Sequence, residues 1–221
     1  MEPGDTVVAA TRLYGGSVQQ LTNMIRKFGW SCEFVDVDDL AAVKTALQKP
    51  KVKALFIESL ANPGAVVADI SALADAAHAA GVPLMVDNTL ATPYLCNPLA
   101  HGADIVIHST TKFLSGHGSC MGGVVIDSGK FDWTKYPEKF PSLASPNPAY
   151  HGLNFAAALG PMAFTFYGIA IGLRDLGLCL SPFNAWCTLT NIATLPLRME
   201  KHCANAKVFF HAAPCLPCTR L

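Results

Sequence analysis

The chain has 221 residues, of which 51% are apolar, so it is long enough to bury one sizeable core. Its 16 basic residues balance its 16 acidic residues, which argues against binding to nucleic acid or to an anionic membrane surface. The first five residues are acidic overall and lack the pattern of a secretory signal, so we expect a cytoplasmic protein. The eight cysteines are then expected to be reduced.

Strand and helix patterns alternate through the first half of the chain. Apolar and β-branched runs predict strands at residues 6–10, 32–37, 53–58, 83–86, 104–107 and 122–126. Helical spacing predicts helices at residues 18–28, 40–47 and 70–80, with Asp38 or Asp39 capping the second and Asp69 the third. This alternation predicts an α/β fold in which a mostly parallel sheet has helices on both faces.

The second half of the chain is apolar and nearly uncharged. Residues 140–173 and 176–197 contain no Lys, Arg, Asp or Glu. The pattern predicts two long helices, residues 155–178 with a kink at Pro161 and residues 183–208. Polar residues, prolines and glycines before Pro161 interrupt the span of about 20 apolar residues that a membrane needs. We therefore favour burial against a partner subunit or another domain over a membrane.

Cys215 and Cys218 have the spacing of half a zinc site or of a redox pair. No second pair of cysteines accompanies them at a matching distance. Coincidence is therefore the favoured interpretation, and we predict no metal site.

Polar side chains follow four of the predicted strands at the points where these strands end. Because the carboxyl ends of parallel strands meet at one edge of a sheet, we expect these side chains to lie together. For the turn that ends in Lys112, an ordinary polar turn with a solvated lysine is the alternative. The side chains are Tyr14, Asn62, Asp87, Ser109, Thr111 and Lys112.

This set of side chains suits pyridoxal phosphate. That cofactor needs an amine for its aldehyde, an acid near its pyridine nitrogen, hydroxyl or amide donors for its phosphate and a flat face for its ring. Lysine, aspartate, serine, threonine and tyrosine provide those groups. The predicted cofactor is therefore pyridoxal 5'-phosphate.

The amino-acid sequences of four motifs resemble those of the Cys/Met metabolism (trans-sulfuration) family of pyridoxal-phosphate enzymes. The resemblance covers residues 5–208 and is carried by Leu13-Tyr14-Gly15-Gly16 and by the stretches 58–63, 86–95 and 102–123. It implies the large domain of a type I pyridoxal-phosphate enzyme, followed by long helices.

The resemblance also implies a role for each candidate residue. Lys112 would hold the cofactor covalently, Asp87 would pair with its pyridinium nitrogen and Tyr14 would stack on its ring. Lys112 and Tyr14 would be the catalytic residues. The other cofactor-binding residues would be Asn62, near the phenolic oxygen, and Ser109 and Thr111, at the phosphate.

Within the family, Gly16 and the stretches 150–152 and 174–184 look most like O-acetylhomoserine sulfhydrylases. The implied activity is γ-replacement of O-acetylhomoserine, an amino acid, with sulfide or a thiol to give homocysteine. Cystathionine γ-synthase or a γ-lyase of the same family is one alternative, and a non-catalytic, degenerate fragment is another. The resemblance further implies a homo-oligomer.

Members of the family are longer at both ends. The resemblance implies an amino-terminal segment with further phosphate ligands and a carboxyl-terminal domain with an arginine for the substrate carboxylate, which neither Arg198 nor Arg220 matches. We expect a truncated form in three parts. These are a cofactor-binding domain at residues 1–150, helices leading to a missing small domain at residues 151–208, and a divergent tail at residues 209–221.

Overall fold

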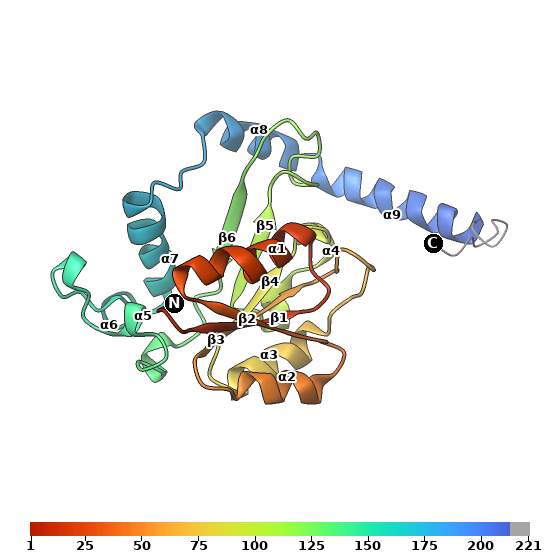
Figure 1. Cartoon of the computed structure of the whole chain (residues 1–221). Helices are drawn as coiled ribbons and strands as arrows, with labels where there is room; N and C mark the ends of the chain where they lie inside the picture. Colours follow the sequence, from red (N-terminus) through yellow and green to blue (C-terminus); the bar gives the residue numbers. More distant parts are fainter. Residues whose placement is uncertain (213–221) are drawn as a thin grey trace.

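The computed structural model describes residues 1–212 (Figure 1). Over these residues, six strands form one sheet in the order β2-β1-β3-β4-β5-β6. Strands β1 to β5 are parallel, and β6 runs antiparallel to β5 with Gly123 opposite Ser109. The predicted mostly parallel α/β fold is confirmed. The strands are β1 (Thr6–Ala10), β2 (Ser31–Val35), β3 (Val52–Glu58), β4 (Leu84–Asp87), β5 (Ile105–Ser109) and β6 (Gly123–Asp127).

Local sequence signals explain where the first helices begin and end. Helix α1 (Gly15–Gln19) continues through wider and tighter turns to Phe28 and stops at Gly29, whose φ of 77° suits glycine. Asp39, rather than Asp38, caps α2 (Leu40–Leu47) by accepting from two backbone N–H groups. Asp69 caps α3 (Ile70–Ala79) by accepting from the backbone N–H of Ala72.

Both faces of the sheet are covered. Because side chains alternate along each buried strand, neighbouring residues of one strand pack on opposite faces. Leu84 and Val86 of β4 pack in one core cluster with side chains of α2 and α3. Met85 and Ile105 point to the other face and join a second cluster, built from residues 131–170. Figure 1 shows α2 and α3 below the sheet and α5 (Pro141–Ala144), α6 (Phe155–Leu159) and α7 (Ala163–Tyr167) to its left.

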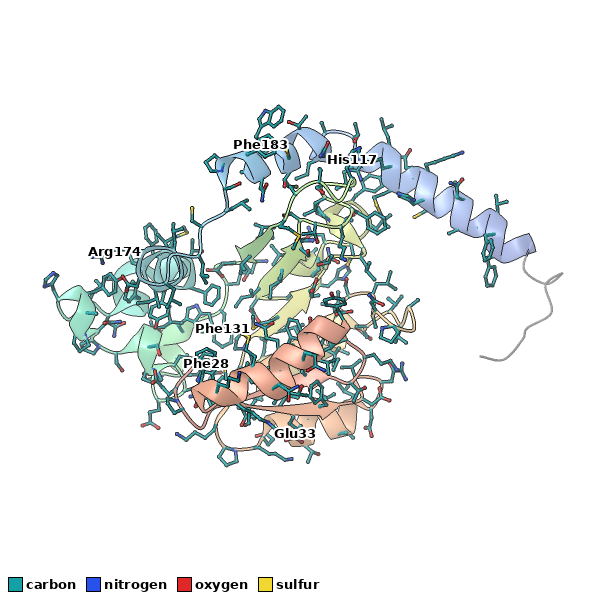
Figure 2. All side chains as sticks on the ribbon, turned by 45° about the horizontal axis from the view of Figure 1, so that its top comes forward. Phe28, Glu33, His117, Phe131, Arg174 and Phe183 are labelled. Atoms are coloured by element: carbon teal, nitrogen blue, oxygen red, sulfur yellow. The ribbon has the colours of Figure 1, made fainter. Side chains whose placement is uncertain are left out.

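Aromatic rings dominate the second cluster. Trp133 is 5% exposed, and its ring stacks on Phe164 with 5.6 Å between ring centroids. Phe131, labelled in Figure 2, lies 4.7 Å from the Trp133 ring and contacts Phe140 edge to face. These contacts fasten the short helices to the sheet through large buried surfaces.

The prediction of one helix over residues 155–178 is wrong. Helix α6 ends at Gly160, which has a φ of 50°, and a tight turn at Gly160–Met162 separates it from α7. Gly168–Asp175 then continues as a wider helical turn. Pro161 lacks a backbone N–H and its ring clashes with the preceding turn, so the helix stops there instead of bending.

The second predicted helix, over residues 183–208, is also divided. Helix α8 (Pro182–Ile192) is capped by Ser181 and is separated by a short turn from α9 (Leu195–Ala212). Large apolar side chains of α8 are open to solvent, among them Trp186 at 61% exposure. The three-part division of the chain stays a prediction. Cys215 and Cys218, and most of the predicted tail, lie outside the described residues.

Counted as one segment across Pro161, Phe155–Asp175 is long and apolar enough to cross a membrane by length and composition. The sequence pattern predicted a long apolar helix here, but polar residues, prolines and glycines were expected to interrupt a membrane-length span. One such segment is weak evidence, because core helices of soluble proteins pass the same test. Here Phe155 and Ala163 belong to the aromatic cluster on the sheet.

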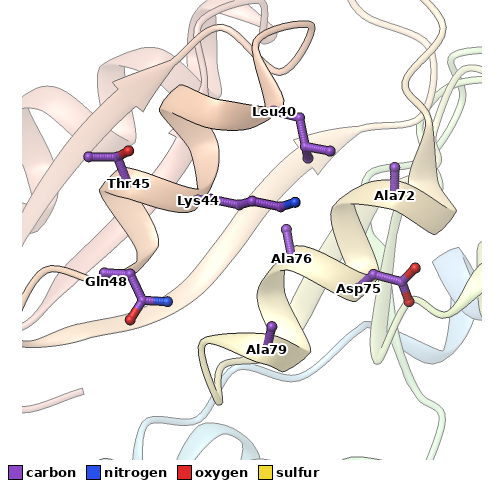
Figure 3. Close-up of a pocket in the computed structure, with 8 residues that line it drawn as sticks. All are labelled: Leu40, Lys44, Thr45, Gln48, Ala72, Asp75, Ala76 and Ala79. Atoms are coloured by element: carbon purple, nitrogen blue, oxygen red, sulfur yellow. The ribbon is translucent and has the colours of Figure 1, made fainter.

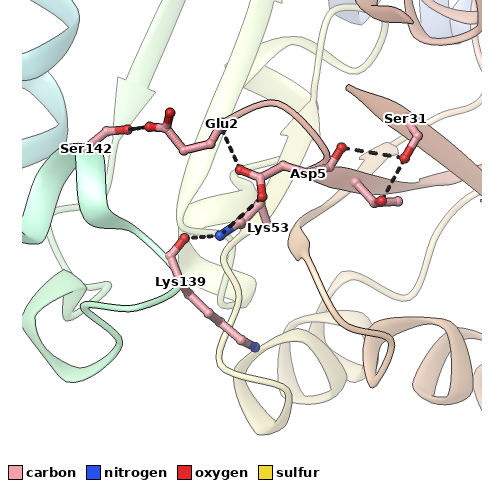
Figure 4. A network of polar contacts seen from close by, with 7 residues as sticks. Glu2, Asp5, Ser31, Lys53, Lys139 and Ser142 are labelled. Carbon is pink, nitrogen blue, oxygen red and sulfur yellow. Dashed lines mark hydrogen bonds and ion pairs between the residues drawn. The ribbon is translucent and has the colours of Figure 1, made fainter. Parts of the chain in front are cut away.

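A polar network at the amino ends of β1 and β3 connects the sheet to the segment around residues 139–142 (Figure 4). Asp5 and Lys53, at 1% and 8% exposure, form an ion pair with 3.4 Å between Oδ1 and Nζ. The Lys53 amine also donates to the carbonyl of Lys139, and Ser142 donates to Glu2. Removing one partner of a buried ion pair is costly, so this network anchors the segment before α5.

Candidate active site

A cavity of about 430 Å³ opens at the carboxyl ends of β1, β3, β4 and β5. It has the size of a small-molecule site, and it lies where open α/β sheets bind ligands. All six side chains singled out in the sequence line it. The lining residues used below are Tyr14, Glu58, Asn62, Asp87, Thr89, Ser109, Thr111 and Lys112.

The lysine and the tyrosine face each other across this cavity. Lys112 lies in the turn after β5, and its Nζ is 5.8 Å from the centroid of the Tyr14 ring. Tyr14 comes between β1 and α1, and half of its surface is exposed. The ring is therefore accessible as a flat platform, with a primary amine at its face.

Asp87 is the last residue of β4, and Thr89 orients its carboxylate. Oδ1 of Asp87 accepts from the backbone N–H of Thr89 at 2.9 Å and from the Thr89 hydroxyl. The same hydroxyl oxygen accepts from the backbone N–H of Ser109 at 2.8 Å. Thr89, which the sequence interpretation missed, thus joins the ends of β4 and β5.

Two hydroxyls form a pair on the β5 side of the cavity. Oγ of Ser109 and Oγ1 of Thr111 are 2.6 Å apart. The intervening Thr110 is buried and does not line the cavity, and its Oγ1 lies beside Gly122. Ser109 and Thr111 therefore present the hydroxyls at this edge of the cavity, and their role as phosphate donors stays a prediction.

Glu58, the last residue of β3, was also missed by the sequence interpretation. It is 7% exposed and binds two loops at once. Oε1 accepts from the backbone N–H of Tyr14 at 2.7 Å, and Oε2 accepts from that of Asn62 at 2.8 Å. Burial, with a smaller contribution from nearby Asp87, raises the pKa of the Glu58 carboxyl. A glutamate at a strand end, four residues before Asn62, was the available signal.

Behind the cavity, a second layer of buried polar groups supports the strand ends. Ser59 donates to Oδ1 of the fully buried Asn88 at 2.6 Å, and the Asn88 amide donates to the carbonyls of Thr92 and Cys96. His108 of β5 is also buried, and burial lowers the pKa of its imidazole. The Ser59 and Asn88 side chains thus hold the loops in place without lining the cavity.

A wider surface groove lies between α2 and α3, away from these residues (Figure 3). Small side chains such as Ala72 and Ala76 form much of its floor, and Lys44 and Asp75 stand on the two facing helices. None of the predicted site residues lines it. The groove lacks the convergent donors and acceptors of the cavity around Lys112, so the cavity is the candidate active site.

The residues of the cavity fit pyridoxal phosphate. Each chemical requirement has a side chain: an amine, a carboxylate held at one oxygen, an aromatic face, and a pair of hydroxyls. They converge on one cavity of suitable volume from the carboxyl ends of neighbouring strands. This fold and donor set define the large domain of a type I pyridoxal-phosphate enzyme.

The comparison with known families supports this assignment to the pyridoxal-phosphate enzymes. The model of the family described as "Cys/Met metabolism PLP-dependent enzyme" matches residues 1–211, and the chain belongs to that family.

The chain is similar to several curated sulfhydrylases. It is 45% identical over 214 residues to the O-acetyl-L-homoserine sulfhydrylase of Leptospira meyeri, covering 93% of this chain and 48% of the relative. It is 40% identical over 204 residues to the homocysteine/cysteine synthase of Saccharomyces cerevisiae, covering 92% of this chain and 46% of the relative. The chain thus spans about half the length of these relatives.

Solved structures show the same relationship. An O-acetylhomoserine (thiol)-lyase of Campylobacter jejuni, solved with a pyridoxyl-lysine phosphate, superposes with a TM-score of 0.91 at 34% identity. The match covers 98% of this chain and 53% of that one. An O-acetylhomoserine sulfhydrylase of Wolinella succinogenes gives a TM-score of 0.80 at 37% identity, covering 98% of this chain and 57% of that one.

Proposed function

We propose that this chain is the cofactor-binding part of an O-acetylhomoserine sulfhydrylase. The substrate would be O-acetylhomoserine, the sulfur donor sulfide or a thiol, and the product with sulfide homocysteine. The convergence of Lys112, Tyr14 and Asp87 on one cavity carries the proposal. Its relatives include O-acetyl-L-homoserine sulfhydrylases and a homocysteine synthase, which supports the choice of reaction.

Each side chain has a defined task in binding. The Lys112 amine would attach to the cofactor aldehyde, and the Tyr14 ring would lie against the pyridine ring. The Asp87 carboxylate would keep the pyridine nitrogen protonated, because a nearby negative charge favours the charged form of that nitrogen. The remaining contacts would come from Ser109 and Thr111 to the phosphate and from Asn62 beside the phenolic oxygen.

When bound, pyridoxal phosphate supplies an electron sink next to the substrate amine. The chain's own contribution is then to move protons. As a free base, the Lys112 amine would take and return protons at Cα and Cβ of the substrate. In the overall replacement, the Cγ–O bond would break with release of acetate, and a Cγ–S bond to sulfide would form at the same carbon.

Covalent capture of the cofactor tests the assignment of Lys112. We expect the purified chain, mixed with pyridoxal phosphate, to turn yellow, and borohydride to fix the cofactor on the peptide that contains Lys112. Lys112→Ala abolishes both signals, whereas Lys130→Ala, which changes an exposed lysine outside the cavity, keeps both. An unlabelled Lys112 peptide in the wild-type chain contradicts the proposal.

Substrate assays separate the candidate reactions. O-acetylhomoserine with sulfide is expected to give homocysteine, and cystathionine or methionine is expected to be a poor substrate. Structures of a cystathionine γ-lyase of Lactobacillus plantarum and of metB of Corynebacterium glutamicum also match, at TM-scores of 0.76 and 0.77, so these substrates are the necessary comparison. A chain that captures the cofactor but turns over none of them supports the non-catalytic fragment.

The exposed apolar side chains of α8 support a homo-oligomer as part of the proposal. Phe183 and Trp186 are 66% and 61% exposed, and Phe183 stands free of the sheet in Figure 2. Such a surface favours burial against another chain. Sedimentation of the chain with and without the cofactor would measure its oligomeric state.

A further inference from the structure

Arg198 of α9 binds the backbone of the turn that carries Lys112. Its Nη1 donates to the carbonyl of Phe113 at 2.7 Å, and its Nη2 donates to that of Leu114 at 3.5 Å. These are the two residues directly after Lys112. One guanidinium therefore holds the main chain on the carboxyl side of the lysine.

The same guanidinium is fixed at the junction of α8 and α9. Its Nε donates to the Thr194 hydroxyl at 3.0 Å, and Nη2 also donates to the carbonyl of Asn191 at 3.0 Å. Figure 2 places His117, in the loop after Lys112, beside this junction. All three nitrogens of Arg198 are engaged, so its planar group has one orientation.

The turn closes around the lysine and leaves room for the guanidinium. Gly116 donates its N–H to the Lys112 carbonyl at 2.7 Å, and Ser115 donates to the Thr110 carbonyl at 3.1 Å. A Cβ at Gly116 would lie 2.6 Å from Nη1 of Arg198. Glycine at residue 116 therefore permits the close approach of Arg198, besides taking a φ of 74°.

Apolar packing supports the contact independently of its hydrogen bonds. Leu114, Leu195 and Met199 are each less than 5% exposed and form one small cluster with Phe113. Removing the guanidinium leaves this cluster in place. A variant of Arg198 thus tests the polar contact separately from the docking of α9.

We propose that Arg198 is a positioning residue, which holds the turn of Lys112 so that the amine stays at the face of Tyr14. The inference rests on the proposed function, since it assigns Lys112 as the reacting amine. A lysine that must meet an aldehyde and then two substrate carbons gains from a fixed backbone, because a misplacement of 1 Å can cost about a hundredfold in rate.

Amide hydrogen exchange tests the inference without cofactor. In the full chain, Arg198→Met is expected to speed exchange at the amides of Ser115 and Gly116 by about tenfold or more, and Arg198→Lys to recover part of the protection. Arg174→Met is the matched control, because Arg174 is exposed and lies far from this turn in Figure 2. Unchanged exchange in Arg198→Met overturns the inference.

A glycine pair provides a second route if Arg198→Met does not fold. Gly116→Ala drives a methyl group into the guanidinium, whereas Gly118→Ala carries a similar backbone cost, at a φ of 64°, with nothing within 4 Å. We expect Gly116→Ala to accelerate exchange at Ser115 and Gly118→Ala to leave it within about twofold. Equal effects of the two alanines contradict a role for Arg198.

Cofactor capture then links the turn to the chemistry. The rate of borohydride-trapped labelling of Lys112 is expected to fall in Arg198→Met and to recover in part in Arg198→Lys. If the wild-type chain captures no pyridoxal phosphate, the proposed function fails, yet the exchange result still decides the role of Arg198. If capture proceeds at the wild-type rate in Arg198→Met, the positioning role fails while the proposed function stands.

Discussion

The ring of Tyr14 fills the space in which a side chain at residue 16 would begin. A Cβ at Gly16 would lie 2.5 Å from Cε1 of Tyr14. The same ring faces the Lys112 amine, whose Nζ is 5.8 Å from its centroid. The absence of a side chain at Gly16 therefore helps to place the aromatic platform opposite the lysine.

Gly16→Cys is expected to displace the Tyr14 ring and to weaken retention of pyridoxal phosphate by about three- to tenfold, the size of a lost aromatic contact. Titration of the chain with the cofactor, followed by its visible absorbance, measures the change. Gly172→Ala is the control, because a Cβ there has nothing within 4 Å. An unchanged affinity in Gly16→Cys would show that the ring adjusts without loss.

Asp87→Asn separates the charge of residue 87 from its structural contacts. The amide oxygen still accepts from the N–H and the hydroxyl of Thr89, so the free energy of unfolding should change by less than about 1 kcal/mol. Without the negative charge, turnover of O-acetylhomoserine should fall by about a hundredfold or more. Urea unfolding and a homocysteine assay give the two values. Wild-type turnover in this variant would remove Asp87 from the proposed role.

Glu58→Gln is expected to loosen the loops of Tyr14 and Asn62 together. A glutamine has one carbonyl oxygen for the two N–H groups that Glu58 binds, so one partly buried donor loses its acceptor. The expected cost is about 1–3 kcal/mol in the free energy of unfolding. Urea denaturation compares it with Glu138→Gln, which changes an exposed glutamate. Equal stability of the two variants would contradict the role of Glu58.

His108 should make the stability of the fold depend on pH. Burial lowers the pKa of its imidazole below the ordinary value of 6.5, so the unfolded chain binds the proton more readily than the folded chain. The contribution is fully present above pH 6.5 and is lost as the pH falls toward the lowered pKa. His108→Gln should flatten this slope in pH-dependent unfolding, and the exposed His101 provides a control as His101→Gln. The same slope in both variants would contradict the assignment.

The candidate site was largely predictable because its residues stand at strand ends. Tyr14, Asp87 and Lys112 each follow an apolar run, and parallel strands bring their carboxyl ends to one edge. Glu58 and Thr89 were missed because their roles depend on backbone N–H groups that belong to other loops. No local pattern shows which N–H group a carboxylate or hydroxyl will meet.

The second half of the chain shows where periodicity misleads. The uniform apolar spacing predicted continuous helices, but Gly160 and Pro161 end one helix, and a short turn before Leu195 divides the other. Apolar spacing reports which faces are buried, and it does not report where a backbone donor is missing or where packing requires a turn.

The sequence by itself determined the alternation of strands and helices, the order of the polar strand ends and the chemistry that they can perform together. These follow from local propensity and from the residue types present. Only the tertiary structure decided that Arg198, 86 positions after Lys112, holds the lysine's turn, and that Glu58 joins two loops. Contacts of this kind depend on how distant segments pack, because directional hydrogen bonds form only after the backbone groups are brought within about 3 Å.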